Sequence, residues 1–212
     1  LNYPAKSPSP RADSHTRFET VYLQHGVLAS GVAHALNRHL KRIGLFVVAT
    51  EFERRSLLED QYLYSEKNIA LTGQPRFDGL WEENTENVIM VAPTWRGNLA
   101  KILNSSDDQK VGFLETNFYK GYSDFLSDPK LHKLLNEHNF SLEFYLHPML
   151  YKAFEFFAPL ENARIQIMNP PNKYNYAMSR AALLITDYSG LAYDFAYTRK
   201  PLIYAHFDFA EF

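Results

Sequence analysis

Short apolar runs alternate with amphipathic segments along this 212-residue chain, and this alternation constrains its fold more than any other feature. The runs are continuously apolar, as in strands that are covered on both faces. We therefore predict strands at residues 20–23, 45–49, 69–72, 88–92, 142–146, 164–168, 183–186 and 202–204. The amphipathic segments predict helices at residues 30–43, 51–59, 112–127, 129–137, 151–157, 174–181 and 191–197. This order of elements is typical of α/β proteins with parallel sheets.

A polar break at residues 82–87 predicts a boundary between two halves of the chain. We expect an irregular, proline-rich segment at residues 1–18, part of one parallel-sheet domain at residues 19–83, and a Rossmann-like domain at residues 84–212. Because Leu1 is not methionine, we expect the chain to be a piece of a longer protein. About three predicted strands precede the break and about four strand-helix units follow it, so we expect the first half to be the end of one domain and the second to be most of another.

Composition excludes several classes of protein. Hydrophobic residues make up 46% of the chain and charged residues 22%, which excludes disorder over most of its length. The formal charge of −2 argues against a nucleic-acid binder, which needs a basic surplus on one face. No apolar run is long enough to cross a bilayer and no secretory signal opens the chain, so we expect a cytoplasmic protein.

The sequence also lacks the usual signatures of metals and cofactors. It contains no cysteine, no His-Glu-x-x-His motif and no acidic cluster with metal-ligand spacing, so we expect no metal site. It contains neither a Gly-x-Gly-x-x-Gly fingerprint nor a phosphate loop, and we expect no bound cofactor.

Ligands of open α/β sheets bind at the carboxyl ends of strands, so the turns after the predicted strands are candidate sites. His25 and Gly26 follow the first strand, where a near-neutral pKa suits a general base, although a packed or capping histidine fits the pattern too. After the fourth strand, Thr94 can bind an anion or cap a helix, and Arg96 offers a forked donor for phosphate. Trp95 as an apolar plug beside a solvated Arg96 is the alternative.

Two further turns have the same character. Pro148 restricts the backbone of His147, and the two strand-end histidines either face each other across a cleft or occur there by chance. Residues 186–190 run from a buried strand into a helix that contains Asp194, and the start of such a helix attracts anions. An ordinary helix cap is the alternative, and it is compatible with phosphate binding.

The predicted helix at residues 30–43 combines basic side chains with an apolar stripe, namely Arg38, Lys41 and Arg42 with Val32, Leu36, Leu40 and Ile43. A basic amphipathic helix can contact an anionic membrane or polymer. The alternative is that the stripe faces a core, and we keep peripheral contact with the inner face of the cell membrane open.

Six short segments occur in one order between residues 20 and 212. They are Gln-His-Gly at 24–26, Thr-Glu-Phe-Glu-Arg-Arg at 50–55, Thr-Gly-Gln-Pro-Arg-Phe-Asp at 72–78, Pro-Thr-Trp-Arg at 93–96, His-Pro at 147–148, and Thr-Asp-Tyr-Ser-Gly at 186–190 with Asp-Phe-Ala-Tyr at 194–197 and Lys-Pro at 200–201. In these segments the chain resembles the CDP-glycerol glycerophosphotransferase family, the bacterial polymerases and primases of teichoic acid and capsule polymers.

The resemblance implies a GT-B-like fold, in which two Rossmann-like halves flank the active site. By this likeness residues 19–83 are the C-terminal part of the acceptor-side domain, and residues 84–212 are the truncated domain that binds the CDP-linked donor. It implies an enzyme that transfers glycerol phosphate, or another polyol phosphate, from CDP-glycerol or a related CDP-polyol to an anionic polymer or lipid-linked acceptor, with release of CMP. By this likeness His25 is the catalytic base and His147 the second essential histidine. The positions that match the family's substrate site are Gly26, Arg76, Thr94, Trp95, Arg96, Thr186, Ser189, Gly190 and Asp194.

The chain departs from the family pattern at two positions that bear on donor recognition. Gly190 stands where the family often has a second serine, and Tyr145 stands where a basic residue is common. Two other functions fit the same pattern: a nucleotide-sugar glycosyltransferase or epimerase of the same architecture, and a nucleotide-binding domain without turnover.

Overall fold

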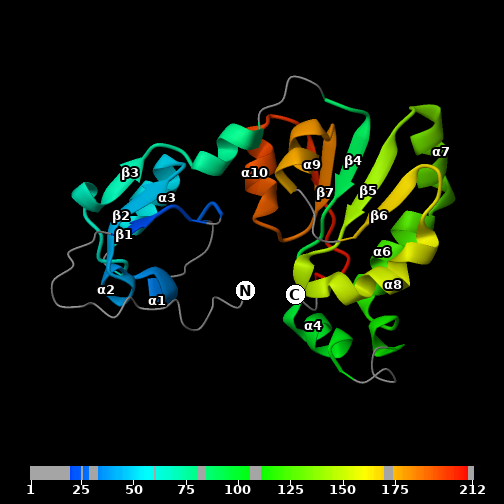
Figure 1. Cartoon of the computed structure of the whole chain (residues 1–212), viewed down its shortest axis with the longest axis horizontal. Coiled ribbons are helices and arrows are strands. Elements are labelled where there is room, and N and C mark those ends of the chain that lie inside the picture. Colours follow the sequence, from blue (N-terminus) through cyan, green and yellow to red (C-terminus); the bar gives the residue numbers. More distant parts are fainter. Residues whose placement is uncertain are drawn as a thin grey trace. The chain divides into compact units, whose positions relative to one another are not determined.

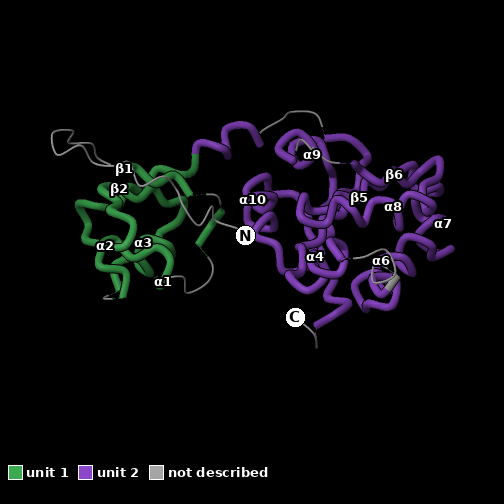
Figure 2. The backbone as a smooth tube through the Cα atoms, turned by 60° about the horizontal axis from the view of Figure 1, so that its bottom comes forward, with its two compact units in different colours: residues 1–74 green, residues 75–212 purple. Residues whose placement is uncertain are grey.

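The computed structural model describes residues 20–24, 26–28, 33–59, 61–80, 85–105, 111–169 and 174–209. The chain forms two compact units, Leu1–Gln74 and Pro75–Phe212, which Figure 2 distinguishes by colour. Each unit contains its own parallel sheet with helices packed against it. The predicted α/β class with parallel sheets is therefore confirmed.

The first unit is built on a sheet of three parallel strands in the order β1-β2-β3 (Figure 1). Its elements are β1 (Thr20–Tyr22), α1 (Ala33–Leu36), α2 (Arg38–Lys41), β2 (Ile43–Val48), α3 (Glu51–Leu57), the 3₁₀ helix η1 (Glu66–Asn68) and β3 (Ile69–Leu71). Its core is apolar and aromatic, and includes Leu28, Leu36, Ile43, Phe46, Val48, Leu57, Tyr62 and Tyr64.

The single helix predicted at residues 30–43 is wrong. The structure has two short helices there, and Asn37 separates them because its side chain caps α2 by accepting a hydrogen bond from His39 N at 3.0 Å. Ile43 begins β2, where it is buried with Leu36, whereas Leu40 is 68% exposed. The apolar stripe is therefore divided between the core and the surface, and its first member, at position 32, lies outside the described residues.

The second unit is built on five parallel strands in the order β6-β5-β4-β7-β8. The strands are β4 (Val88–Val91), β5 (Ser141–Tyr145), β6 (Ile165–Met168), β7 (Leu183–Thr186) and β8 (Leu202–Tyr204). The α-helices are α4 (Gly97–Leu103), α6 (Asn117–Ser127), α7 (Pro129–Glu137), α8 (Phe154–Phe157), α9 (Tyr174–Arg180) and α10 (Leu191–Tyr197). The 3₁₀ helices are η2 (Pro75–Leu80), η3 (Val111–Phe113), η4 (Pro148–Ala153) and η5 (Ala158–Leu160).

Helices cover both faces of this sheet. Figure 1 shows α9 and α10 on one side of the strands and α6, α7 and α8 on the other. The larger core lies on the side of α6 to α8, where it includes Val91, Phe113, Phe118, Tyr122, Leu142, Phe144, Phe157 and Ile185. Strands that are covered in this way have continuously apolar sequences, which explains why every predicted strand is confirmed to within about two residues at each end.

Two features differ from the expectation for residues 75–110. The units separate between Gln74 and Pro75, earlier than the polar break at residues 82–87, because Phe77 of η2 stacks on Tyr197 of α10 with ring centroids 4.7 Å apart. Helix α4 was not predicted, because it is short and begins at Gly97, a residue that favours loops over helix interiors.

Candidate functional site

The carboxyl edge of the second sheet has a switch point between β4 and β7. The chain leaves central β4 toward β5 and β6, then returns to β7 on the other side. Loops that diverge in this way leave a ligand-binding crevice at the strand ends. The two loops are joined here, because Thr94 N donates to Asp187 Oδ1 at 2.8 Å and Thr186 Oγ1 donates to Ala92 O at 2.7 Å. Thr186 is fully buried, so its hydroxyl serves this link.

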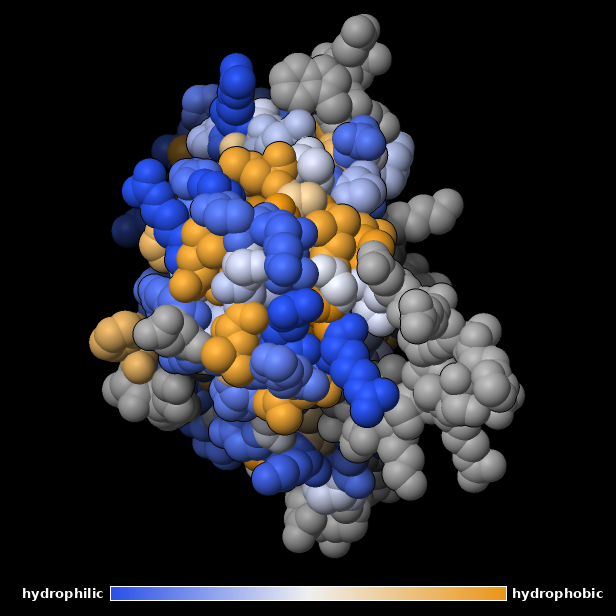
Figure 3. Space-filling model, turned by 90° about the vertical axis from the view of Figure 1, so that its left-hand side faces the viewer, coloured by the Kyte–Doolittle hydropathy of each residue, from blue (hydrophilic) through white to orange (hydrophobic). Residues whose placement is uncertain are grey.

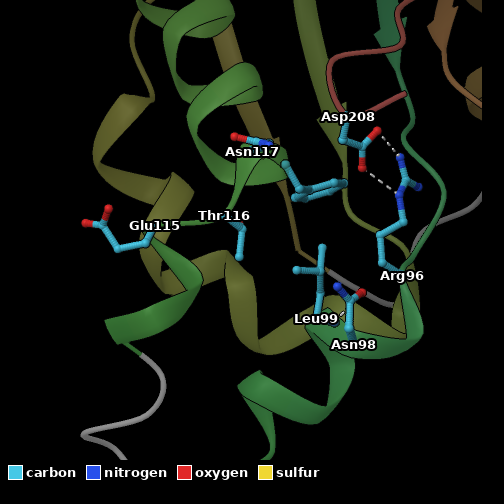
Figure 4. A pocket seen from close by; sticks show the side chains of 8 residues that line it. Arg96, Asn98, Leu99, Glu115, Thr116, Asn117 and Asp208 are labelled. Carbon is cyan, nitrogen blue, oxygen red and sulfur yellow. Dashed lines mark hydrogen bonds and ion pairs between the residues drawn. The ribbon is translucent and has the colours of Figure 1, made fainter. Parts of the chain in front are cut away.

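Arg96 lies beneath these loops rather than in solvent. It is 8% exposed, and its Nε and Nη2 each donate to a different oxygen of Asp208 at 2.9 Å, as Figure 4 shows. Nη2 also bonds Asp187 Oδ2 at 2.9 Å, and Nη1 bonds Thr94 O at 2.6 Å. The alternative of a solvated Arg96 is therefore wrong.

A small cavity lies beside the Arg96–Asp208 pair. It has a volume of about 190 Å³ and opens between the starts of α4 and α6 (Figure 4). Its lining is mixed in polarity and consists of Arg96, Asn98, Leu99, Glu115, Thr116, Asn117, Phe118 and Asp208. The Arg96–Asp208 pair therefore forms part of a cavity wall, whereas its link to Asp187 extends to the loop after β7.

The loops after β4 and β5 meet through Trp95 and His147. Their rings stack with centroids 6.0 Å apart and planes 25° apart. His147 Nδ1 accepts a hydrogen bond from Met149 N at 3.2 Å, which leaves the proton of a neutral imidazole on Nε2. Burial lowers the pKa of His147 from its usual value, so the neutral ring is the form present at pH 7.

The turn after β7 forms the start of α10. Ser189 Oγ accepts a hydrogen bond from Leu191 N at 3.2 Å, but Ser189 lies one residue before the N-cap Gly190, and no side chain among the described residues caps the helix. Gly190 is exposed, has ordinary helical dihedrals, and has no atom within 4 Å of the position that a Cβ would take. The backbone at this position therefore has no requirement for glycine.

Arg76 and Asp194 form an ion pair. Arg76 Nη2 lies 2.6 Å from Asp194 Oδ1, and the pair joins η2 to α10. Asp194 is buried, and this burial raises the pKa of its carboxyl although Arg76 opposes the shift. Arg76 Nε is also buried, and the structure shows no hydrogen-bond partner for it among the described residues.

His25 lies outside the described residues, but several residues near it in the sequence are well defined. Gly26 O accepts a hydrogen bond from Gln74 Nε2 at 3.3 Å. Glu53 is fully buried and accepts hydrogen bonds from Gln24 Nε2 at 3.3 Å and from Leu28 N at 2.7 Å.

Glu53 also caps the N-terminus of α3. Its Oε2 accepts hydrogen bonds from Ala49 N at 2.8 Å and Thr50 N at 3.0 Å, and Thr50 Oγ1 accepts from Glu53 N in return. This is a capping box, and the Thr-x-x-Glu spacing within the segment 50–55 is the sequence signal for it.

Sequence reasoning also missed the roles of Asp187 and Asp208. Asp187 lies inside the segment 186–190, whose pattern assigns it no role, and Asp208 lies outside all six segments. The available signal was weak: an aspartate that directly follows a predicted buried strand, or that stands between two phenylalanines, is a candidate for a buried, paired carboxylate.

The described residues form neither a metal-binding cluster nor a membrane-spanning helix. Within the described ranges, no three His, Cys, Asp or Glu side chains group closely enough to hold a metal ion. Among the helices that the structure describes, none has both the length and the apolar character to cross a membrane.

Comparisons with known proteins point to one group. The family model described as CDP-Glycerol:Poly(glycerophosphate) glycerophosphotransferase matches residues 15–212. The minor teichoic acid biosynthesis protein GgaB of Bacillus subtilis is 28% identical over 198 residues, which are 90% of this chain and 21% of GgaB. The teichoic acid ribitol-phosphate polymerase TarK of Staphylococcus aureus is 27% identical over 164 residues, which are 69% of this chain and 29% of TarK.

Solved structures of the wall teichoic acid polymerase TagF share the fold. The superposition on TagF has a TM-score of 0.55 at 16% identity, and covers 89% of this chain and 47% of TagF. A TagF variant soaked with CDPG gives a TM-score of 0.53, also at 16% identity, with 91% and 47% covered. The predicted GT-B-like fold class is thereby confirmed, whereas this chain spans less than half the length of these relatives.

Proposed function

Because the chain belongs to the CDP-Glycerol:Poly(glycerophosphate) glycerophosphotransferase family, we propose that its protein transfers a polyol phosphate from a CDP-linked donor to a teichoic-acid-like or capsular polymer. In this reaction an acceptor hydroxyl oxygen attacks the β-phosphorus of the donor. The bond from that phosphorus to the bridging oxygen breaks, CMP leaves, and the polyol phosphate becomes a phosphodiester on the polymer. The hydroxyl proton passes to a general base, for which we propose His25.

The observation that carries this proposal is the convergence of predicted donor residues at one sheet edge. Thr94 and Trp95 follow β4, His147 follows β5, and the segment 186–190 follows β7. Stacking joins the first two of these loops, and the bond from Thr94 to Asp187 joins the first to the third. A nucleotide diphosphate at the switch point would contact all three loops.

We assign the diphosphate of the donor to His147, Arg76 and the backbone around Ser189 and Gly190. A neutral His147 donates through Nε2–H, which suits a phosphate oxygen whose charge increases as CMP leaves. Arg76 contributes a positive charge that pairs with Asp194 through Nη2, while its buried Nε has no hydrogen-bond partner among the described residues.

The remaining predicted residues take supporting roles. We propose that Thr94 Oγ1, which is buried without a hydrogen-bond partner among the described residues, binds the donor, and that Asp194 orients Arg76 and a donor hydroxyl. The N–H groups of Arg96 and the hydroxyl of Thr186 donate hydrogen bonds to other protein atoms, so we propose that these two residues hold the loops in place.

The site of action is part of the same proposal. We propose a cytoplasmic protein that meets its acceptor at the inner face of the cell membrane. The support is the exposed face of α2, on which His39, Lys41 and Arg42 surround the exposed Leu40. In the view of Figure 3, several apolar patches lie among hydrophilic side chains.

Binding and transfer measured on the full-length protein test the proposal. CDP-glycerol and CMP should bind in calorimetry while UDP does not, and CDP-ribitol should be titrated alongside to identify the polyol. His25→Ala should abolish transfer of labelled polyol phosphate, and His147→Ala should lower it at least tenfold. His138→Ala is the matched control, because His138 is exposed at the end of α7.

Two results would support the other functions. Binding of UDP instead of CDP would favour a nucleotide-sugar transferase or epimerase. Nucleotide binding with no transfer, unchanged by His25→Ala, would favour a domain without turnover.

A further inference from the structure

We propose that Asp187 and Asp208, joined through Arg96, are positioning residues that set the geometry of the donor site. This inference rests on the proposed function, since it concerns how the donor loops are held. Neither aspartate is predicted to contact the donor.

The first observation is the burial of three charged groups in one place. Arg96 is 8% exposed, Asp187 1% and Asp208 6%. The planar guanidinium of Arg96 forms ion pairs with both carboxylates, a geometry that the ammonium group of lysine cannot reproduce. Buried charges of this kind often contribute less to stability than apolar side chains of similar size would, so their value here lies in geometry.

The second observation is that the three residues come from three neighbouring loops. Arg96 follows β4, Asp187 follows β7, and Asp208 lies in the turn after β8. These strands are adjacent in the sheet, but Arg96 and Asp208 are 112 positions apart in the sequence. The ionic contacts therefore connect the ends of three strands that the backbone connects only through long crossovers.

The third observation links these contacts to the donor. Asp187 Oδ2 binds Arg96, while Oδ1 accepts hydrogen bonds from Thr94 N at 2.8 Å and Tyr188 N at 2.6 Å. Thr94 and the residue after Tyr188 are both assigned to the donor site. A displacement of Asp187 would consequently move the loops after β4 and β7 together.

The fourth observation concerns the turn that carries Asp208. The neighbouring Phe207 packs edge-on against Tyr122 of α6, with ring centroids 5.0 Å apart. Tyr122 also donates a hydrogen bond to Asp187 Oδ2 at 3.4 Å. Asp208 is thus anchored to the helix layer, and through Arg96 it relates the donor loops to that layer.

Asp208→Asn tests the inference because Asp208 is the member of the group that lies farthest along the chain from the assigned donor residues. We expect the KM for CDP-glycerol to rise at least tenfold and the kcat to fall less. Arg96→Lys should raise the KM at least as much, because it also breaks the contacts of Arg96 with Asp187 and Thr94 O. The double variant should have the same KM as Arg96→Lys alone, because Asp208→Asn then removes no further contact with Arg96.

Asp128→Ala is the matched control. It removes a carboxylate that caps α7 through Lys130 N at 2.7 Å, so it should lower Tm without changing KM. A purely structural role for Asp208 would reduce the fraction of folded protein, which lowers kcat and leaves KM unchanged.

The possible outcomes separate the two proposals. If the unsubstituted protein binds neither CDP-glycerol nor CMP, the proposed function fails. If the unsubstituted protein binds CDP-glycerol, and the KM of Asp208→Asn is within twofold of the unsubstituted protein's KM, only the positioning role is overturned. If Asp208→Asn does not fold, Arg96→Lys decides by the same KM criterion, and the lack of a KM change in a folded Arg96→Lys variant would also overturn it.

Discussion

At the scale of single residues, the environment of His147 defines its chemistry. The ring is stacked on Trp95, and its Nδ1 is bound by a backbone amide, so rotation of the imidazole would break two contacts. Burial lowers the pKa because it disfavours the charged imidazolium. A ring that is held neutral and oriented in this way can donate a hydrogen bond at physiological pH without accepting a proton first.

The lowered pKa predicts a pH dependence of stability. As the pH falls below about 6.5, the unfolded chain protonates His147 before the folded protein does, so the free energy of unfolding decreases until the folded-state pKa is passed. The stability that neutral His147 supports is thus fully present above pH 6.5. Urea unfolding of the protein and of His147→Gln should show that the difference between them falls from pH 7.5 to pH 5. A difference that is independent of pH would contradict the prediction.

Gly190 allows a second prediction at this scale. Serine at this position meets no atom within 4 Å of its Cβ and has allowed dihedrals, so Gly190→Ser should change the free energy of unfolding by less than about 0.5 kcal/mol. The added hydroxyl lies at the assigned diphosphate site, and we expect CDP-glycerol to bind more tightly in calorimetry.

Gly73→Ser is the control for that variant. Its Cβ would also find open space, but Gly73 has a φ of +81°, which strains any side chain. We expect it to cost about 1 kcal/mol. Equal costs at the two glycines would show that the backbone conformation is not the deciding factor.

At the scale of secondary-structure elements, the loops after β4, β7 and β8 depend on helices that pack beside them. Helix α6 approaches the turn after β8 so closely that a Cβ at Gly121 would lie 2.6 Å from Phe207 Cβ. Phe207 neighbours Asp208, and so the absence of a side chain at position 121 affects the geometry around Arg96.

Gly121→Ala should therefore destabilise the protein even though alanine favours helices. Helix propensity contributes about 1 kcal/mol in favour of alanine, whereas overpacking costs about 1–3 kcal/mol and displaces the turn. We expect a lower Tm and weaker donor binding, both largely restored by adding Phe207→Ala. Gly112→Ala in η3, where a Cβ meets no atom within 4 Å, should be close to neutral.

At the scale of the whole molecule, the chain contains two compact units with separate cores. The core around Phe46 and Tyr62 belongs to the first unit, and the core around Phe118 and Phe144 to the second. These two core clusters have no described residue in common. Two cores of different size favour independent unfolding rather than one cooperative transition.

We accordingly predict two transitions in urea, each sensitive to its own substitution. Glu53→Ala leaves the amides of Leu28, Ala49 and Thr50 without their acceptor and should lower the stability of the first unit by about 3 kcal/mol. Gly121→Ala should shift the other transition alone. Glu51→Ala, which removes an exposed ion pair with Arg54, should cost less than about 1 kcal/mol. Coincident transitions that move together would contradict this prediction.

The sequence by itself determined the strands and the turns that follow them. A strand covered on both faces must be apolar throughout, and this local property is visible in any stretch such as 183–186. Proline and glycine after these runs identified the turns at the carboxyl ends, including those of Thr94, His147 and Ser189. The sequence determined the helices less fully, because the capping side chain of Asn37 divides a segment whose periodicity predicts one helix.

The tertiary structure alone decided which turns meet. The order β6-β5-β4-β7-β8 brings Arg96 to Asp187 and Asp208. Asp187 lies 91 positions after Arg96 in the sequence and Asp208 lies 112 positions after it, and no local pattern specifies contacts over such separations. The same holds for Glu53, whose contacts reach back 25 positions to Leu28. Periodicity reflects the backbone geometry of one segment, whereas a buried ionic contact depends on how separate segments pack, and only the folded chain contains that information.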